Sequence, residues 1–293
     1  MKKTVSAIVM FLVIGSVFRP SLFGKAFDAD FSVVMIDDAT EAKLGPFPYD
    51  RSILAQGIQA CARLHAKAVI LKFFIDLPKT DSGDEALATS FTAIPVALQA
   101  SLGGEGSSSR QLPTKFKYSP NPEPAMASND RGLIPLQRLL DAAAKVGFVD
   151  FPKSIGFLTQ DIPLIESYQG SAYPSLILSC LEMATGDNAS SRAPGQIDVG
   201  KGYLRVDSLN VHRAHLRGPA TIKTISFVDL LDGKVSESEI GGKVVVIGLD
   251  TRKGPSVVLK NGPISSTIGL HRYFVLCLAA AYRDLMDSVQ ASR

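Results

Sequence analysis

The sequence predicts an α/β fold, a layered sandwich in which a mainly parallel central sheet carries helices on both faces. Helix-like and strand-like segments alternate along the 293 residues, and this alternation is typical of α/β proteins. The run 243–248 (KVVVIG) is almost continuously apolar, as expected for a parallel strand that is covered on both faces. The composition, with 46% hydrophobic and 20% charged residues, indicates a globular chain and excludes general disorder.

The first predicted elements set the topology of the sheet. A strand at 31–36, an amphipathic helix at 51–65 and a strand at 68–74 follow one another, and this order predicts a right-handed βαβ crossover. Later elements continue the alternation around loops at 44–50, 101–131 and 186–200. We expect helices at 84–91, 134–144, 172–185, 225–231 and 268–286, and strands or extended segments at 94–99, 146–151, 157–166, 203–206, 209–217 and 243–248.

The N-terminal segment has the pattern of an export signal. Lys2 and Lys3 precede an apolar run at 5–18, which is shorter than the roughly 20 residues of a membrane-spanning helix. Gly24 and Ala26 follow in a small-x-small arrangement suited to cleavage. We therefore expect residues 1–26 to be a signal peptide or a short membrane anchor. Residues 27–293 would then form one periplasmic or extracellular domain, tethered to the inner membrane if the segment stays uncleaved.

The charge and the cysteine content argue against a nucleic-acid-binding protein and against a fold built on a disulfide framework. Without residues 1–26 the chain keeps 27 basic and 28 acidic residues, a net charge of −1, and no basic block marks a nucleic-acid partner. Cys61, Cys180 and Cys277 are widely spaced and odd in number, which is no disulfide framework. They are three buried thiols, or one disulfide and a free thiol.

One motif resembles a known family. Residues 36–51 read IDDATEAKLGPFPYDR, similar to the opening of the CHASE type 2 family: I-D-D after a strand, then L-G-x-aromatic-P-aromatic-x-R before a helix. The resemblance extends over roughly residues 30–285. It continues at 73–75 with Asp84, Ala86 and Leu87, and at 146–149 (VGFV), 173–176 (YPSL), 217–219 (RGP), 243–248 (KVVVIG) and 268–271 (IGLH).

The resemblance implies a sensory domain outside the membrane, for ligands that are largely undefined in the family. Two segments depart from the family pattern. Residues 154–160 (SIGFLTQ) lack the acid and the arginine of D-G-V-x-R, and 249–260 match G-D-x-x-x-T-P only loosely. The transmembrane helices and the cyclase or kinase that usually follow such a domain are also missing, so we expect a separate membrane signalling protein as partner.

Candidate ligand-binding residues follow from strand ends, because ligands of open α/β sheets gather outside the carboxyl ends of the strands. Asp37 and Asp38 end the first strand, Asp76 follows the second and Asp250 follows the central one. An acid in such a turn also forms local hydrogen bonds, so each has a structural alternative as a cap. We expect Asp37 or Asp38 to face Arg51 in a charge-assisted contact.

Two further features join the candidates. His271, at the start of the last predicted helix, is a ligand contact or a structural histidine; His212 and His215 would point to opposite faces of a strand and make a poor metal pair. Phe47 and Tyr49, framed by prolines, form either a rim over a pocket or a packed lid. The predicted ligand-binding residues are therefore Asp37, Asp38, Arg51, Asp76, Asp250 and His271.

The favoured function is an extracytoplasmic ligand-sensing or binding domain without catalytic output, which takes an unknown small molecule or peptide. No nucleotide, hydrolase or zinc motif identifies a cofactor, a metal site or catalytic residues. Two alternatives stay open. One is an exported metal-assisted hydrolase that uses Asp37, Asp38 and Asp250, and the other is a degenerate structural or inhibitory remnant.

Overall fold

The computed structural model describes residues 27–102, 108–119, 130–150, 159–216, 222–261 and 264–291. Its centre is a six-stranded sheet in which every neighbouring pair is parallel. In spatial order the strands are β11 (Thr224–Ser226), β1 (Phe31–Asp37), β12 (Val244–Asp250), β2 (Ala68–Leu71), β3 (Val96–Ala100) and β4 (Lys145–Phe148). Strand β12 lies between β1 and β2 and is fully buried from Val244 to Gly248, which confirms the prediction of a central strand there.

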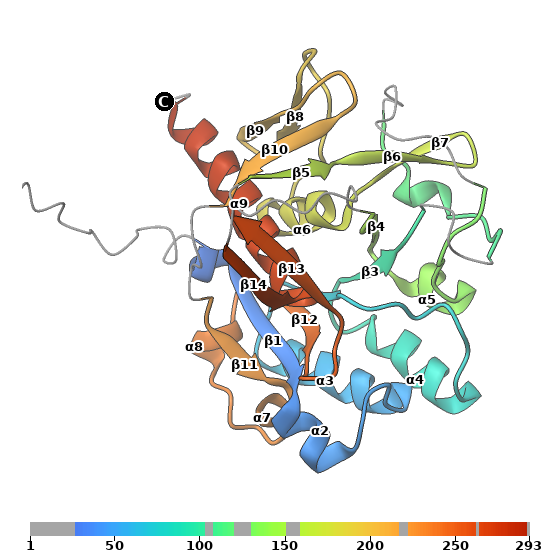
Figure 1. Cartoon of the computed structure of the whole chain (residues 1–293). Helices are drawn as coiled ribbons and strands as arrows, with labels where there is room; N and C mark the ends of the chain where they lie inside the picture. The colour runs from blue at the N-terminus through green and yellow to red at the C-terminus, as the bar shows by residue number, and fades with distance from the viewer. Residues whose placement is uncertain are drawn as a thin grey trace, which may run out of the picture.

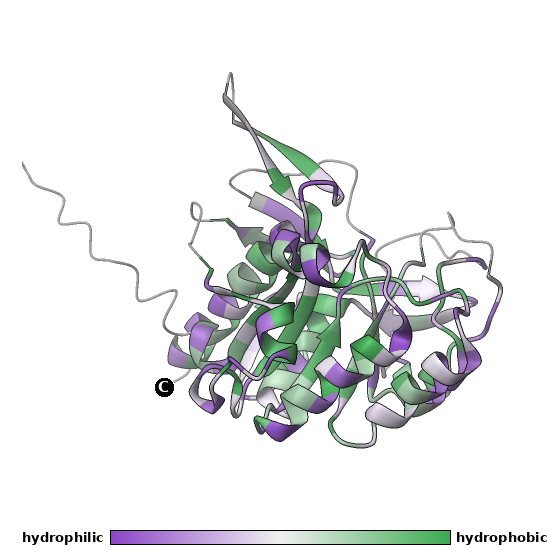
Figure 2. Ribbon diagram, turned by 90° about the horizontal axis from the view of Figure 1, so that it is seen from below, coloured by the Kyte–Doolittle hydropathy of each residue, from purple (hydrophilic) through white to green (hydrophobic). Residues whose placement is uncertain are grey.

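Helices cover both faces of this sheet (Figure 1). Alternate side chains of β1 enter two separate cores: Val34 and Ile36 belong to one, Val33 and Met35 to the other. The first core also takes side chains from α3 (Arg51–Arg63), α4 (Asp81–Ser90), α5 (Gln137–Ala142) and α7 (Phe227–Leu231), and the second takes them from α6 (Leu176–Thr185) and α9 (Leu270–Ala291). Apolar strands therefore lie between helices whose hydrophilic sides face outward (Figure 2), and the predicted layered α/β fold is confirmed.

Shorter elements complete the described part of the chain. Four antiparallel pairs lie outside the main sheet. They are β5 (Thr159–Pro163) with β10 (Val211–His215), β6 (Ile165–Tyr168) with β7 (Ser171–Pro174), β8 (Gln196–Val199) with β9 (Gly202–Arg205), and β13 (Ser256–Asn261) with β14 (Ile264–Gly269). Helices α2 (Asp38–Leu44) and α8 (Glu237–Ile240) and a 3₁₀ turn (Thr114–Phe116) are the other short elements.

Several boundaries differ from the prediction for identifiable reasons. The helix expected at 172–185 begins at Leu176, because residues up to Pro174 pair with β6 and Ser175 caps the helix by accepting from Leu178 N–H at 3.1 Å. The last helix likewise begins at Leu270, after a strand that pairs with β13. Strands β9 and β10 are adjacent in sequence but pair with β8 and β5. Pairing with distant segments, which local patterns do not encode, sets these limits.

Two short elements, helix α2 and strand β11, were not predicted from the sequence. The segment directly after β1 forms helix α2, although it carries few apolar residues to indicate a helix. The segment expected as the start of a helix at 225 is instead the edge strand β11, which pairs with β1 from Val33 to Met35. The three cysteines are free and buried, which confirms the prediction of buried thiols.

Candidate functional site

The carboxyl ends of β2, β3 and β4 open into a cavity of about 780 Å³, which we call the carboxyl-edge cavity. Its walls also include the start of α3 and the first turns of α9. The apolar lining residues include Phe47, Phe73, Phe74, Leu77, Val149 and Phe274. The polar lining residues are Arg51, Lys72, Asp76, Lys79, Gln99, Ser101, Asp150 and His271.

The six predicted ligand-binding residues divide into two groups at this edge of the sheet. Arg51, Asp76 and His271 line the carboxyl-edge cavity. Asp37, Asp38 and Asp250 lie at the ends of β1 and β12, where Asp37 is the register partner of Asp250, and they are not part of its lining. The structure thus brings three of the six residues to one cavity and leaves the other three beside it.

Arg51 is buried at the start of α3, and its counter-ion differs from the expected one. Its Nε lies 3.6 Å from Oδ1 of Asp84, which is only 2% exposed, and a terminal N–H donates to Leu77 O at 3.4 Å. Neither Asp37 nor Asp38 is its partner, which corrects the predicted contact. Helix α3 carries its first residue toward α4 rather than toward the end of β1, so Arg51 links α3 to α4 through Asp84 and to the segment before α4 through Leu77.

The conformation of His271 identifies its protonation state. Its Nδ1 accepts the backbone N–H of Leu249 at 3.1 Å, so the ring proton is on Nε2. Burial, together with the nearby charge of Lys72, lowers the pKa of His271 to about 3. A Cβ at Gly248 would stand 3.2 Å from His271 Cβ, so glycine there lets α9 approach β12. The histidine is neutral and fixes the first turn of α9 to the sheet.

Asp37 serves as the cap of α2. Its Oδ1 accepts from the Thr40 N–H at 2.9 Å, from the Thr40 hydroxyl at 2.7 Å and from the Ser226 hydroxyl at 2.8 Å. Burial by itself would raise the pKa of Asp37, but these hydrogen bonds outweigh it and hold the pKa below its ordinary value. One carboxyl group therefore joins β1, α2 and β11.

The other two strand-end acids form ion pairs with arginines. Asp38 accepts from the Arg252 backbone N–H at 3.0 Å and lies 2.9 Å from Arg252 Nε. Asp250 lies 2.5 Å from Arg272 Nε on α9. The described residues contain no group of three His, Cys, Asp or Glu side chains that could hold a metal ion. The acids required by the hydrolase alternative are thus engaged with hydroxyls and arginines.

Lys72 is a residue of this cavity that the sequence reasoning missed. It follows β2 directly, is 3% exposed, and donates from Nζ to Gln99 Oε1 at 2.7 Å. Its Nζ lies 4.9 Å from the centre of the Phe274 ring, within range of a cation–π contact. Burial lowers the pKa of Lys72 to about 7. The signal in the sequence was a single lysine inside the apolar run AVILKFF.

A pair of carboxyl groups supports the wall of the cavity beside β4. Asp150 accepts from the Ser101 hydroxyl at 2.5 Å and from the Leu102 N–H at 2.6 Å. Behind it, burial and the Asp150 carboxylate raise the pKa of Glu166 to about 9. Glu166 is therefore neutral at physiological pH.

The aromatic pair at the turn before α3 divides between the two predicted roles. Phe47 lines the cavity and contacts the Phe73 ring edge-on, with centroids 5.3 Å apart. Tyr49 is 3% exposed and packs against Phe47 at 5.6 Å. Phe47 thus belongs to the rim, whereas Tyr49 belongs to the packed layer beneath it.

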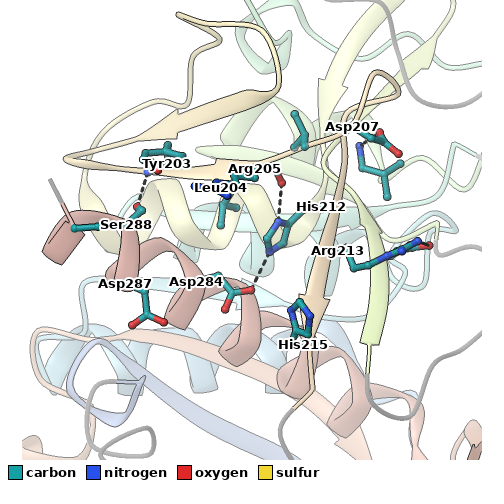
Figure 3. Close-up of a pocket in the computed structure, with 14 residues that line it drawn as sticks. Tyr203, Leu204, Arg205, Asp207, His212, Arg213, His215, Asp284, Asp287 and Ser288 are labelled. Carbon is teal, nitrogen blue, oxygen red and sulfur yellow. Dashed lines mark hydrogen bonds and ion pairs between the residues drawn. The ribbon is translucent and has the colours of Figure 1, made fainter.

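A second hollow, of about 740 Å³, lies between β9, β10 and the C-terminal half of α9 (Figure 3), and we call it the terminal-helix hollow. His212 points into it, with Nδ1 donating to Arg205 O at 2.8 Å and Nε2 lying 3.3 Å from Asp284 Oδ2. His215 is exposed where His212 is buried, as expected for opposite faces of a strand. Arg213 and Asp161 also line the hollow and form an ion pair at 2.7 Å. These side chains connect β10 to α9 and to β5.

The helices of the described residues differ from membrane-spanning segments. Within those ranges, none of the helices combines the length and the apolar composition needed to cross a membrane. The segment 1–26, predicted to be a signal peptide or a short anchor, lies outside the described residues. So do residues 151–158, which contain most of the segment that departs from the family pattern.

Comparison with known proteins agrees with the motifs in the sequence. The model of the CHASE2 domain family matches residues 7–288, nearly the whole chain. Comparisons with curated proteins and with solved structures gave no match. CHASE2 domains are extracytoplasmic sensory domains and are typically not catalytic. This chain, with its parallel sheet and the LGPFPYDR motif before α3, therefore belongs to the CHASE2 domain family.

Proposed function

We propose that this chain is an extracytoplasmic sensor that binds a small molecule or peptide in the carboxyl-edge cavity and has no catalytic output of its own. The observation that carries the proposal is the cavity itself. It has a volume of about 780 Å³, apolar walls and a few convergent polar side chains, which are the usual properties of a small-molecule site. It also lies at the carboxyl edge of parallel strands, where ligands of such sheets bind.

Helix α9 is the element through which a bound ligand would act. Its first turns contribute Leu270, His271 and Phe274 to the cavity, and its last turns contribute Asp284 and Ser288 to the terminal-helix hollow. A ligand that contacts the first turns and has unequal affinity for two positions of α9 would shift the population between them. We propose that a separate membrane signalling protein reads the resulting change at the far end of the helix.

A binding screen with a blocked cavity tests the first part of this proposal. The full chain is screened by thermal shift against amino acids, sugars, nucleosides, carboxylic acids and short peptides. We expect at least one compound to raise the Tm of the wild type but not of Val149→Trp, which fills the cavity. Val258→Trp, on the exposed face of β13, is the matched control and keeps the response. A ligand that stabilises Val149→Trp as much as the wild type would show that it binds elsewhere.

Hydrogen exchange tests transmission along α9. With a compound from the screen bound, we expect altered exchange at residues 283–291 as well as at the cavity-lining turns. Changes confined to residues 270–274 would show that α9 does not transmit the effect of the ligand to its far end.

Export is tested separately by fusing alkaline phosphatase, which is active only outside the cytoplasm, to the C-terminus of the chain. An inactive fusion present at normal levels would contradict the proposed location.

A further inference from the structure

The charged residues of the carboxyl-edge cavity differ in whether they have partners. Arg51 faces Asp84, and Lys79 donates from Nζ to Pro48 O at 2.5 Å. Asp150 accepts from Ser101 and Leu102. For Lys72, by contrast, the described part of the chain contains no carboxylate within ion-pair distance. Asp76 and Asp150 also line the cavity, but neither forms an ion pair with Lys72, so no described residue supplies a counter-ion for this buried cation.

The groups around Lys72 do not neutralise it. Gln99 from β3 supplies one neutral oxygen, and Phe274 from α9 supplies the face of a ring. His271 on α9 is neutral, and burial raises the pKa of the Cys180 thiol on α6, so it carries no charge at neutral pH. An ammonium group has three N–H donors, and the Gln99 amide oxygen takes one of them. The remaining donors have the cavity beside them.

This arrangement is unfavourable for the empty protein. A buried ammonium without a counter-ion has lost its hydration, and the lowered pKa of Lys72 reports that loss. Local rules of this kind are broken chiefly at functional sites, where a ligand completes the arrangement. An anion in the cavity would supply the missing charge and would keep the amine protonated.

We propose that Lys72 binds the carboxylate of a small ligand whose apolar body lies against the aromatic walls of the cavity, with Gln99 and Phe274 holding the ammonium in place. This inference rests on the proposed ligand-sensing function and names the chemical class of the ligand. A carboxylate fits better than a phosphate, because phosphate sites use several donors such as arginine forks or helix N-termini. Here Arg51 is already directed to Asp84.

The probes for the test are 4-phenylbutanoate and its neutral counterpart 4-phenylbutanamide, titrated by NMR into the full chain at pH 6. We expect the carboxylate to bind the wild type at least about tenfold more tightly than the amide. Lys72→Met removes this preference by weakening carboxylate binding about tenfold. Lys223→Met, which removes an exposed lysine outside the cavity, leaves both affinities within about threefold. Equal binding of acid and amide to the wild type would overturn the inference.

A second variant keeps the test independent of any change at Lys72 itself. Gln99→Glu replaces the amide by a carboxylate of nearly the same shape, at a position where Oε1 now lies 2.7 Å from Lys72 Nζ. The new carboxylate should form an ion pair with Lys72, raise the Tm and abolish binding of 4-phenylbutanoate. Binding to the wild type should also weaken about tenfold or more between pH 6.5 and 8.5, as the amine loses its proton. Undiminished binding to Gln99→Glu would contradict the proposal.

The outcomes separate this inference from the proposed function. If a neutral compound from the screen binds the wild type but not Val149→Trp, while 4-phenylbutanoate does not bind, the cavity is a ligand site and the role of Lys72 is wrong. If Val149→Trp changes the binding of neither probe and of no screened compound, both proposals fail. Carboxylate binding that needs Lys72 and is blocked by Val149→Trp supports both.

Discussion

At the ends of β1 and β12, Asp37, Asp38 and Asp250 each meet hydroxyls or arginines, whereas at the end of β2 Lys72 meets an amide oxygen and an aromatic ring. Both regions belong to the same edge of one sheet. The first holds its charges in caps and ion pairs, and the second leaves a cation buried beside a cavity. The comparison teaches that the position of a charged residue at a strand end does not by itself decide whether its neighbours satisfy it.

The largest expected effect comes from Arg51, the paired cation within the cavity. Asp84→Ala would leave the buried guanidinium without its counter-ion, and such a loss typically costs about 3–5 kcal/mol. We expect a decrease of that size in the free energy of unfolding, measured with urea. Glu85→Ala, on the exposed side of the same helix, is the control and should change stability little. A loss below about 1 kcal/mol for Asp84→Ala would remove the contrast between Arg51 and Lys72.

At Lys72 the expected effect has the opposite sign. Lys72→Met removes a buried charge without leaving one behind, so we expect stability at pH 6 to rise by about 1–4 kcal/mol. Burial lowers the pKa of Lys72 from 10.5 to about 7 in the folded chain. The unfolded chain therefore binds more protons between these values, and wild-type stability increases with pH across this window.

The loss of stability that the buried charge of Lys72 causes is therefore fully present below pH 7 and disappears above about pH 10.5. Urea unfolding at pH 6, 8 and 10 should show the advantage of Lys72→Met shrinking steadily. A variant that is less stable than the wild type at pH 6 would show that the lysine is well satisfied in the empty protein.

Asp37 tests the region at the ends of β1 and β12, where the charges have partners. Asp37→Ala removes the cap of α2 and the contacts to Ser226, with an expected loss of about 0.5–2 kcal/mol. Asp37→Asn keeps an acceptor oxygen and should lose much less. Because the folded pKa of Asp37 lies below 3.8, its contribution is present above that pH and is lost as the pH falls through the folded value. Equal losses in the two variants would mean that the negative charge of Asp37, and not its acceptor oxygen, carries the contribution.

The smallest effect is expected at the exposed pair of Asp38 and Arg252. Arg252 is 92% exposed, and exposed ion pairs contribute little because water and salt screen them. Arg252→Ala should shift the Tm by less than about 1 °C and leave binding of 4-phenylbutanoate unchanged. A loss of binding in this variant would extend the ligand site to the ends of β1 and β12.

The site could be predicted from the sequence only in part. The strand-end argument placed the candidates at the carboxyl edge, where Arg51, Asp76 and His271 line the cavity, and their contact with a ligand stays a prediction. The prediction named acids at strand ends and left out Lys72, the lysine directly after β2. It also paired Arg51 with the nearest acids in the motif, whereas the direction of α3 places Asp84 beside it.

The sequence by itself determined the fold class, the central parallel strand and the family, because these follow from periodicity, apolar runs and local motifs. Only the tertiary structure decided which charged side chains are satisfied. The partners of Asp37 and Lys72 lie 189 and 27 residues away, at Ser226 and Gln99. Hydrogen bonds and ion pairs act over a few ångströms in space, so they depend on which distant segments the sheet brings together.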